Sequence, residues 1–208
     1  RSMWERGWSF IKKAGTIILL STIFVWFTSR FGWLDGQFGM LEEDQISASI
    51  LAKIGNAIAW IFAPLGWGNW QATVASITGL VAKENIVGTL GVLYSGGAGT
   101  VYDAIAAAFN GITGYSFLVF NLLCAPCFAA IGAIKREMNS PKWTWFAIAY
   151  QCGFAYAVAL MINQFGGLFT GNANIIGVIA AVIVLAAIIY MLVRPYKEAT
   201  KLTTKVEM

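Results

Sequence analysis

The stretch that decides the fold runs from Trp143 to Val193 and has the sequence WTWFAIAYQCGFAYAVALMINQFGGLFTGNANIIGVIAAVIVLAAIIYMLV. It contains no charged residue. It is long enough for two membrane crossings, because one helical crossing needs about 20 residues. Glycine and asparagine residues gathered within 166–174 predict a turn between the two halves. We therefore expect two transmembrane helices here, near 143–165 and 175–193.

The remainder of the chain has the same character. Of the 208 residues, 58% are hydrophobic and 12% are charged, whereas a soluble domain carries about 25% charged residues. Further charge-free stretches lie between Lys13 and Arg30, between Lys53 and Lys83, and between Asp103 and Lys135. This pattern predicts an all-α integral membrane helical bundle of about six transmembrane helices within 14–193. The expected spans are near 14–31, 46–65, 70–94, 115–134, 143–165 and 175–193.

The basic residues predict the orientation of these spans. Eleven of the fourteen Lys and Arg residues fall in three segments: 1–13, 135–142 and 194–208. The positive-inside rule places all three in the cytoplasm, and six crossings satisfy this with a cytoplasmic N-terminal segment, 1–13, and a cytoplasmic tail, 194–208. The range 46–65 contains Lys53 and Asn56, so an interfacial helix is its alternative, but five crossings would misplace the second cluster. Basic residues at span ends are an orientation signal, so nucleic acid is not an expected partner.

The predicted span 70–94 contains three adjacent polar residues, Lys83, Glu84 and Asn85. Ionisable groups inside a membrane are costly and usually face a bundle interior or a wet cavity. Glycine residues on either side permit local unwinding, which would expose carbonyl groups to a cation. We therefore consider these three residues candidates for an ion path, with helix-to-helix pairing as the structural alternative.

A second candidate lies in the predicted span 115–134, where the sequence is Cys124-Ala125-Pro126-Cys127. Proline has no N–H, so the carbonyl of Leu122 loses its helical partner. An unbroken helix would place both thiols on one face, and thiolates suit Fe²⁺ better than Na⁺ or Mg²⁺. The chain has no histidine, so a metal site needs such ligands. A buried cysteine also behaves as a small hydrophobe, and for Cys152 that is the expected role.

Other polar residues in the spans have a weaker assignment. Asn121 and Gln151 either line a path or form hydrogen bonds between helices. An enzyme is not expected, because the chain shows no pairing of a nucleophile with a base. A phosphate-binding loop with the pattern Gly-x-x-x-x-Gly-Lys-Ser/Thr is also missing from the sequence.

Several motifs, in order and spacing, resemble the C-terminal membrane region of the ferrous iron transport protein B family. They are Phe10–Leu19, Phe62–Gly66 with Trp70–Ala72, Thr78–Tyr94, Pro126-Cys127 with Ala133–Glu137, and Tyr150-Gln151. The resemblance implies an Fe²⁺ importer of the bacterial inner membrane, with both ends of this chain in the cytoplasm. The family's lysine–glutamate motif falls on Lys83 and Glu84, and its proline–cysteine motif falls on Pro126 and Cys127.

The resemblance also implies partners and cofactors. This chain would hold the second of two gate regions, and a GTP-binding domain and earlier spans of the same polypeptide would precede it. GTP and Mg²⁺ would bind only in that preceding domain, so the chain itself is expected to need no cofactor. Fe²⁺ is the expected substrate and the lipid bilayer the expected surroundings. A homo-oligomer and small accessory transport proteins are further partners that the family allows.

The chain departs from the family pattern in one place that bears on the site. Cys124-Ala125 stands where the family often has Tyr-Thr, so a metal ligand at Cys124 would be particular to this chain. Cys127 and Glu84 are the ligands that the family supports. Two other functions remain open: a gate-type transporter of another solute such as a nucleoside, and a helical scaffold for docking and oligomerisation.

Overall fold

The computed structural model of the chain describes residues 2–34, 37–41, 43–79, 83, 85–94, 100–171 and 174–195. Its fold confirms the all-α helical bundle, with one small antiparallel strand pair at the end of the first helix. In chain order the elements are α1 (Ser2–Arg30), β1 (Phe31–Leu34), β2 (Gln37–Met40), η1 (Glu43–Ala48), α2 (Ile50–Phe62), η2 (Ala63–Leu65), α3 (Trp70–Gly79), α4 (Asn85–Leu93), α5 (Val101–Ala108), α6 (Gly111–Leu123), α7 (Phe128–Met138), α8 (Pro141–Thr170) and α9 (Ile175–Val193).

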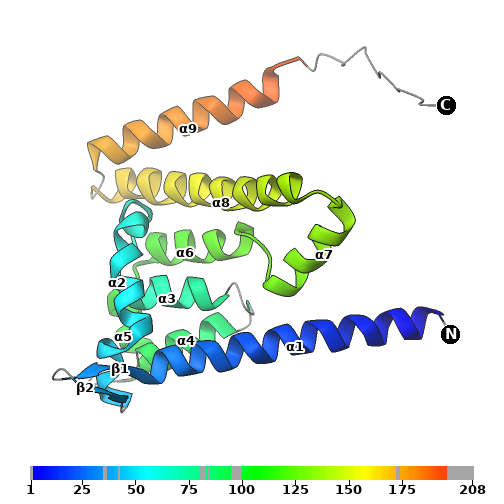
Figure 1. Cartoon of the computed structure of the whole chain (residues 1–208). Coiled ribbons are helices and arrows are strands. Elements are labelled where there is room, and N and C mark those ends of the chain that lie inside the picture. Colours follow the sequence, from blue (N-terminus) through cyan, green and yellow to red (C-terminus); the bar gives the residue numbers. More distant parts are fainter. Residues whose placement is uncertain are drawn as a thin grey trace, which may run out of the picture.

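Most of the helices share one direction, and α2 lies across their ends. In Figure 1, α1, α3, α6 and α8 run side to side, whereas α2 stands upright at the left. The axis of α2 and η2 makes an angle of 95° with that of α3. The range 46–65 therefore follows the ends of the other helices instead of running alongside them. Both the crossing and the interfacial alternative for that range stay predictions.

The turn between α2 and α3 depends on Pro64 and Gly66. Ser49 caps the start of α2 by accepting a hydrogen bond from the Ala52 N–H at 3.0 Å. The helix then tightens into η2, which contains Pro64, and Gly66 follows with a left-handed φ of 92°. A Cβ at Gly66 would overlap the side chains of Asn163 and Thr113, so glycine is needed both for its conformation and for its size.

The predicted span 70–94 is a helical hairpin in the structure. α3 ends at Gly79, Lys83 lies in a turn, and α4 begins at Asn85. Thr78 donates a hydrogen bond to Thr89 at 3.3 Å. Farther from the turn, the Tyr94 hydroxyl donates to Asn69 at 3.2 Å, just before α3 begins. The chain therefore enters along α3, reverses near Lys83 and returns along α4.

The predicted span 115–134 is also interrupted. α6 ends at Leu123 and α7 begins at Phe128, with Cys124 and Cys127 as the flanking cap residues. Pro126 lies in this gap, where its missing N–H cannot continue the helix. α7 then packs against both α1 and α8.

A core of apolar side chains holds the hairpin and α6 against α8. Ala72 and Ala75 of α3 and Ala155 and Ala159 of α8 are all fully buried, and such small residues let helices approach closely. Trp67 is 1% exposed and stacks on Phe62 at 4.6 Å between ring centroids. Ser76 and Gly79 of α3 are buried as well, so small residues line the packed face of this helix.

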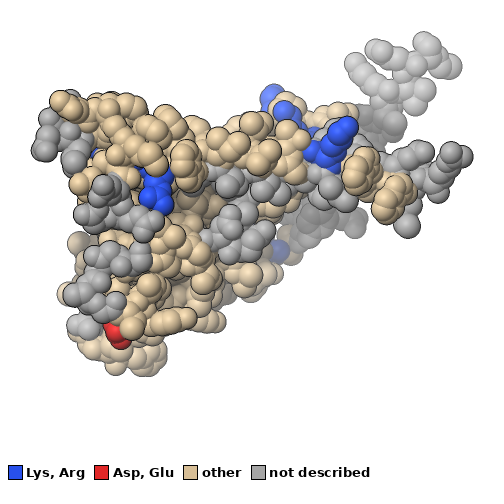
Figure 2. All heavy atoms as spheres, turned by 90° about the horizontal axis from the view of Figure 1, so that it is seen from below, with Lys and Arg blue, Asp and Glu red and all other residues tan. Residues whose placement is uncertain are grey.

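Two helices, α8 and α9, are each long and apolar enough to cross a membrane among the residues that the structure describes. Two bent pairs, α2–η2 with α3 and α5 with α6, meet the same criteria only when each pair is counted together, which gives up to four such spans. Four crossings, like the six expected from the sequence, would place the three basic clusters on the same side of the membrane. α1 begins and α9 ends toward the same side of the molecule in Figure 1, and Figure 2 shows a group of Lys and Arg side chains toward that side. The sidedness itself stays a prediction.

Candidate functional site

The two interruptions, at the hairpin turn and after α6, meet in the structure. The Lys83 ammonium group donates a hydrogen bond to the carbonyl oxygen of Leu122 at 3.1 Å. It donates another to the carbonyl oxygen of Cys124 at 3.2 Å. Two segments about 40 positions apart in the sequence therefore form one site, with the hairpin turn seated on the end of α6.

The sequence predicts one of these acceptors but not its partner. The carbonyl of Leu122 would pair with the N–H of residue 126 in a continuous helix, and residue 126 is proline. The last carbonyls of a helix also carry a partial negative charge, which favours a cation at that position. The Lys83 ammonium group is this cation, and its hydrogen bonds satisfy carbonyls at the end of α6 that have no helical partner.

The cysteines are arranged differently from the prediction. The break after Leu123 removes the helical spacing that would align Cys124 with Cys127. Instead, the sulfur of Cys124 lies 3.7 Å from the sulfur of Cys152, on α8. All three cysteines are free thiols and half-buried. Cys152, expected to be packing only, is thus the thiol beside Cys124, and only the packing of α6 on α8 brings the two together.

Cys127 occupies the N-cap position of α7, and its side chain makes no capping hydrogen bond. The free N–H groups of a helix start give this position a partial positive charge. Cys127 therefore lies where α7 begins, while Cys124 lies where α6 ends.

Asn121 and Gln151 are both near this region along the chain. Asn121 is buried and donates from its amide nitrogen to the Phe117 carbonyl at 2.8 Å. Its amide oxygen faces the hairpin, because a Cβ built on Gly79 would lie 3.8 Å from it. Among the described residues, the Gln151 Oε1 atom is buried without a hydrogen-bond partner. Gln151 directly precedes Cys152 on α8.

Part of the predicted ligand set lies outside the described residues. Glu84 is one such residue, and Asn85 is described only as the first residue of α4. Within the described part of the chain, no group of three or more Cys, Asp or Glu side chains could hold a metal ion. The described atoms of the site are therefore two backbone carbonyls, one ammonium group and the thiols.

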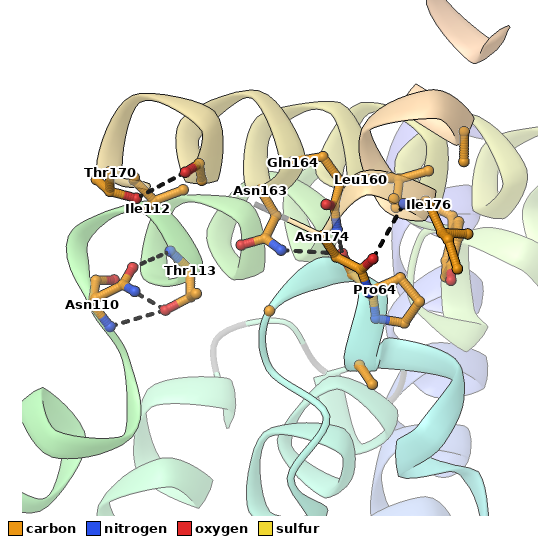
Figure 3. Close-up of a pocket in the computed structure, with 16 residues that line it drawn as sticks. Pro64, Asn110, Ile112, Thr113, Leu160, Asn163, Gln164, Thr170, Asn174 and Ile176 are labelled. Carbon is orange, nitrogen blue, oxygen red and sulfur yellow. Dashed lines mark hydrogen bonds between the residues drawn. The ribbon is translucent and has the colours of Figure 1, made fainter. Parts of the chain in front are cut away.

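A separate cavity of about 660 Å³ lies between α8, α9 and η2. Figure 3 shows Asn163 and Gln164 of α8 pointing toward Pro64. Asn163 donates to the Pro64 carbonyl at 3.1 Å, and Gln164 donates to the same oxygen at 2.6 Å. These two amides therefore join α8 to η2. The residues that line this cavity are neutral.

Comparison with known proteins identifies the family. A family model described as "Gate: Nucleoside recognition" matches residues 11–141. An Fe(2+) transporter FeoB of Methanocaldococcus jannaschii is 40% identical over 171 residues, which is 81% of this chain and 25% of that protein. A Staphylococcus aureus protein of the same name is 35% identical over 81% of this chain.

A third relative, from Porphyromonas gingivalis, is an Fe(2+) transport protein A/Fe(2+) transporter FeoB fusion protein, 29% identical over 80% of this chain. This chain spans about a quarter of the length of these relatives. No solved structure matches the chain. The chain therefore belongs to the gate family of membrane domains, as the C-terminal gate region of the ferrous iron transport protein B family.

Proposed function

We propose that this chain forms part of the path by which Fe²⁺ crosses the bacterial inner membrane in a GTP-dependent importer. The main observation behind the proposal is that Lys83 donates hydrogen bonds to the carbonyls of Leu122 and Cys124, where α6 ends. The thiol of Cys124 lies at the same helix end, close to that of Cys152. Discontinuous helices in transporters offer unwound carbonyls to cations and helix ends to charged groups. The relatives named as Fe(2+) transporters support Fe²⁺ as the cargo.

In this proposal the site binds Fe²⁺ weakly and in passing. Cys127 and Glu84 act as ligands, and Cys124, whose sulfur lies beside that of Cys152, is a further ligand along the path. Lys83 holds the carbonyls when the path is empty and must leave them for a cation to replace it. Permeation needs binding that is strong enough for entry and weak enough for release, so an incomplete ligand set suits it.

The proposal includes the surroundings of the chain. Both ends face the cytoplasm, and a GTP-binding domain of the same polypeptide supplies GTP and Mg²⁺ binding. The fusion of a transport protein A to the Porphyromonas gingivalis relative supports small accessory transport proteins as partners. The gate region itself carries out no chemical reaction.

Uptake of Fe²⁺ by the full-length protein in proteoliposomes tests the path. Cys127→Ser and Glu84→Ala should each reduce uptake at least about tenfold, which corresponds to about 1.4 kcal/mol. Leu118→Ala is the matched control, because Leu118 is 64% exposed on α6 and should leave uptake unchanged. Normal uptake by both site variants would refute the assignment.

A nucleoside is the second candidate substrate, because two observations favour it. The family model is described as nucleoside recognition, and carboxamide side chains of Asn110, Asn163 and Gln164 line the neutral cavity. Amide groups can pair with the edge of a nucleobase. Competition between labelled uridine and Fe²⁺ in the same proteoliposomes separates the candidates, because only a nucleoside transporter accumulates uridine.

A further inference from the structure

The geometry points to a two-thiol site for a soft or borderline divalent cation at Cys124 and Cys152. This inference rests on the proposed function and adds a residue that the family motifs do not contain. Cys124 comes from the end of α6 and Cys152 from the middle of α8, so the site joins two helices. We propose that it is one station of the Fe²⁺ path.

The spacing of the two sulfur atoms fits a bound metal. They lie 3.7 Å apart. Two thiolates in tetrahedral coordination, each about 2.3 Å from the metal, are about 3.8 Å apart. A metal ion can therefore bridge the sulfurs with little movement of either helix. A disulfide needs the sulfurs to approach to about 2.05 Å, which requires a much larger shift.

The charge of the site is balanced when a divalent metal binds the pair. Metal binding releases both thiol protons and leaves two thiolates around the cation. The Lys83 ammonium group lies on the carbonyl of Cys124, one of the two ligand residues, at 3.2 Å. When a cation arrives, loss of two protons keeps the total charge of the site unchanged.

The two thiolates leave the cation with open positions, as a station for transit requires. Gln151, whose side-chain oxygen is buried and has no hydrogen-bond partner among the described residues, directly precedes Cys152 on α8.

Cadmium binding to the purified full-length protein tests the site independently of transport. Cys127→Ser is introduced first, so that Cys124 and Cys152 are the thiols left in this chain. Addition of Cd²⁺ should produce sulfur-to-cadmium absorption in the ultraviolet with release of two protons per metal. Adding Cys152→Ser should abolish this difference absorption, and adding Cys124→Ser instead should do the same.

A cadmium absorption that neither Cys152→Ser nor Cys124→Ser reduces in this background would overturn the inference, and so would the lack of any cadmium absorption before these changes. Size-exclusion chromatography establishes that each variant is folded, and the Cys124→Ser variant tests the pair if Cys152→Ser does not fold. Fe²⁺ uptake is measured separately. Normal uptake by Cys127→Ser and Glu84→Ala would refute the path while leaving the cadmium result to decide this site.

Discussion

Helices of the chain are interrupted at Pro64 and at Pro126, and the carbonyls near the two interruptions are hydrogen-bonded in different ways. Around Pro64, neutral donors serve every described acceptor: Tyr156 donates to Ile61 at 2.7 Å, Ser116 lies 3.0 Å from Leu65, and Asn163 and Gln164 both donate to Pro64. Around Pro126, the acceptors Leu122 and Cys124 receive their hydrogen bonds from the Lys83 ammonium group.

The comparison indicates that the hydrogen bonds around Pro64 are fixed, whereas a cation can replace Lys83 on the carbonyls near Pro126. The donors around Pro64 come from α6 and α8, both packed in the core beside buried Leu65 and Trp67. The donor around Pro126 is a cation at the turn of a hairpin, on a flexible side chain. A metal cation can take the place of an ammonium group on a carbonyl, whereas it cannot easily replace an amide fixed in a helix.

The largest expected effect concerns the rigid break. Gly66→Ala should destabilise the protein by about 3 kcal/mol or more, because strain at positive φ adds to a steric overlap. Gly171→Ala is the matched control, since Gly171 also has a positive φ, 75°, but a Cβ there meets nothing within 4 Å. Thermal unfolding in detergent measures both variants. Equal losses would mean that Gly66 is needed for conformation alone.

A smaller effect is expected at the exchangeable break. Lys83→Met removes the donor to two carbonyls and should cost about 1–3 kcal/mol of stability, because acceptors left unpaired pay a desolvation penalty. Lys83→Arg keeps the charge and should recover part of the loss. Thermal unfolding measures the stability, and Fe²⁺ leak through proteoliposomes without GTP measures the gate. An unchanged leak in Lys83→Met would contradict the view that Lys83 competes with a cation.

A third change tests how firmly the neutral donors hold. Gln164→Leu removes the shorter of two hydrogen bonds to Pro64 and should cost about 1 kcal/mol, the usual scale between membrane helices. Asn163→Leu should cost a similar amount, and the double variant should lose more than their sum, because the carbonyl then has no donor from α8. A strictly additive double variant would show that the two amides do not share this acceptor.

The smallest effect is expected between the two breaks, on α3. The Ser76 hydroxyl is buried and has no hydrogen-bond partner among the described residues. Ser76→Ala should therefore change stability by less than about 0.5 kcal/mol or raise it slightly, because it removes an unsatisfied polar group without opening a large cavity. A loss above about 1 kcal/mol in thermal unfolding would reveal a partner for this hydroxyl.

Much of the fold and part of the site could be predicted from single residues. The charge-free stretch at 143–193 covers all of α9 and all but the first two residues of α8. The carbonyl of Leu122 loses its helical partner, as Pro126 predicts. The hairpin of α3 and α4 could not be predicted in the same way, because an apolar stretch has the same composition whether it crosses a membrane or turns back within it.

The sequence by itself determined that the chain is a membrane protein and that the helical hydrogen-bond pattern is interrupted at Pro64 and Pro126. These properties follow from local chemistry: apolar side chains need a solvent other than water, and proline has no N–H to donate. Only the tertiary structure decided which side chains lie next to each interruption of the helices. Lys83 reaches Leu122, and Cys124 lies beside Cys152 rather than paired with Cys127, because packing between helices far apart in sequence brings these groups together.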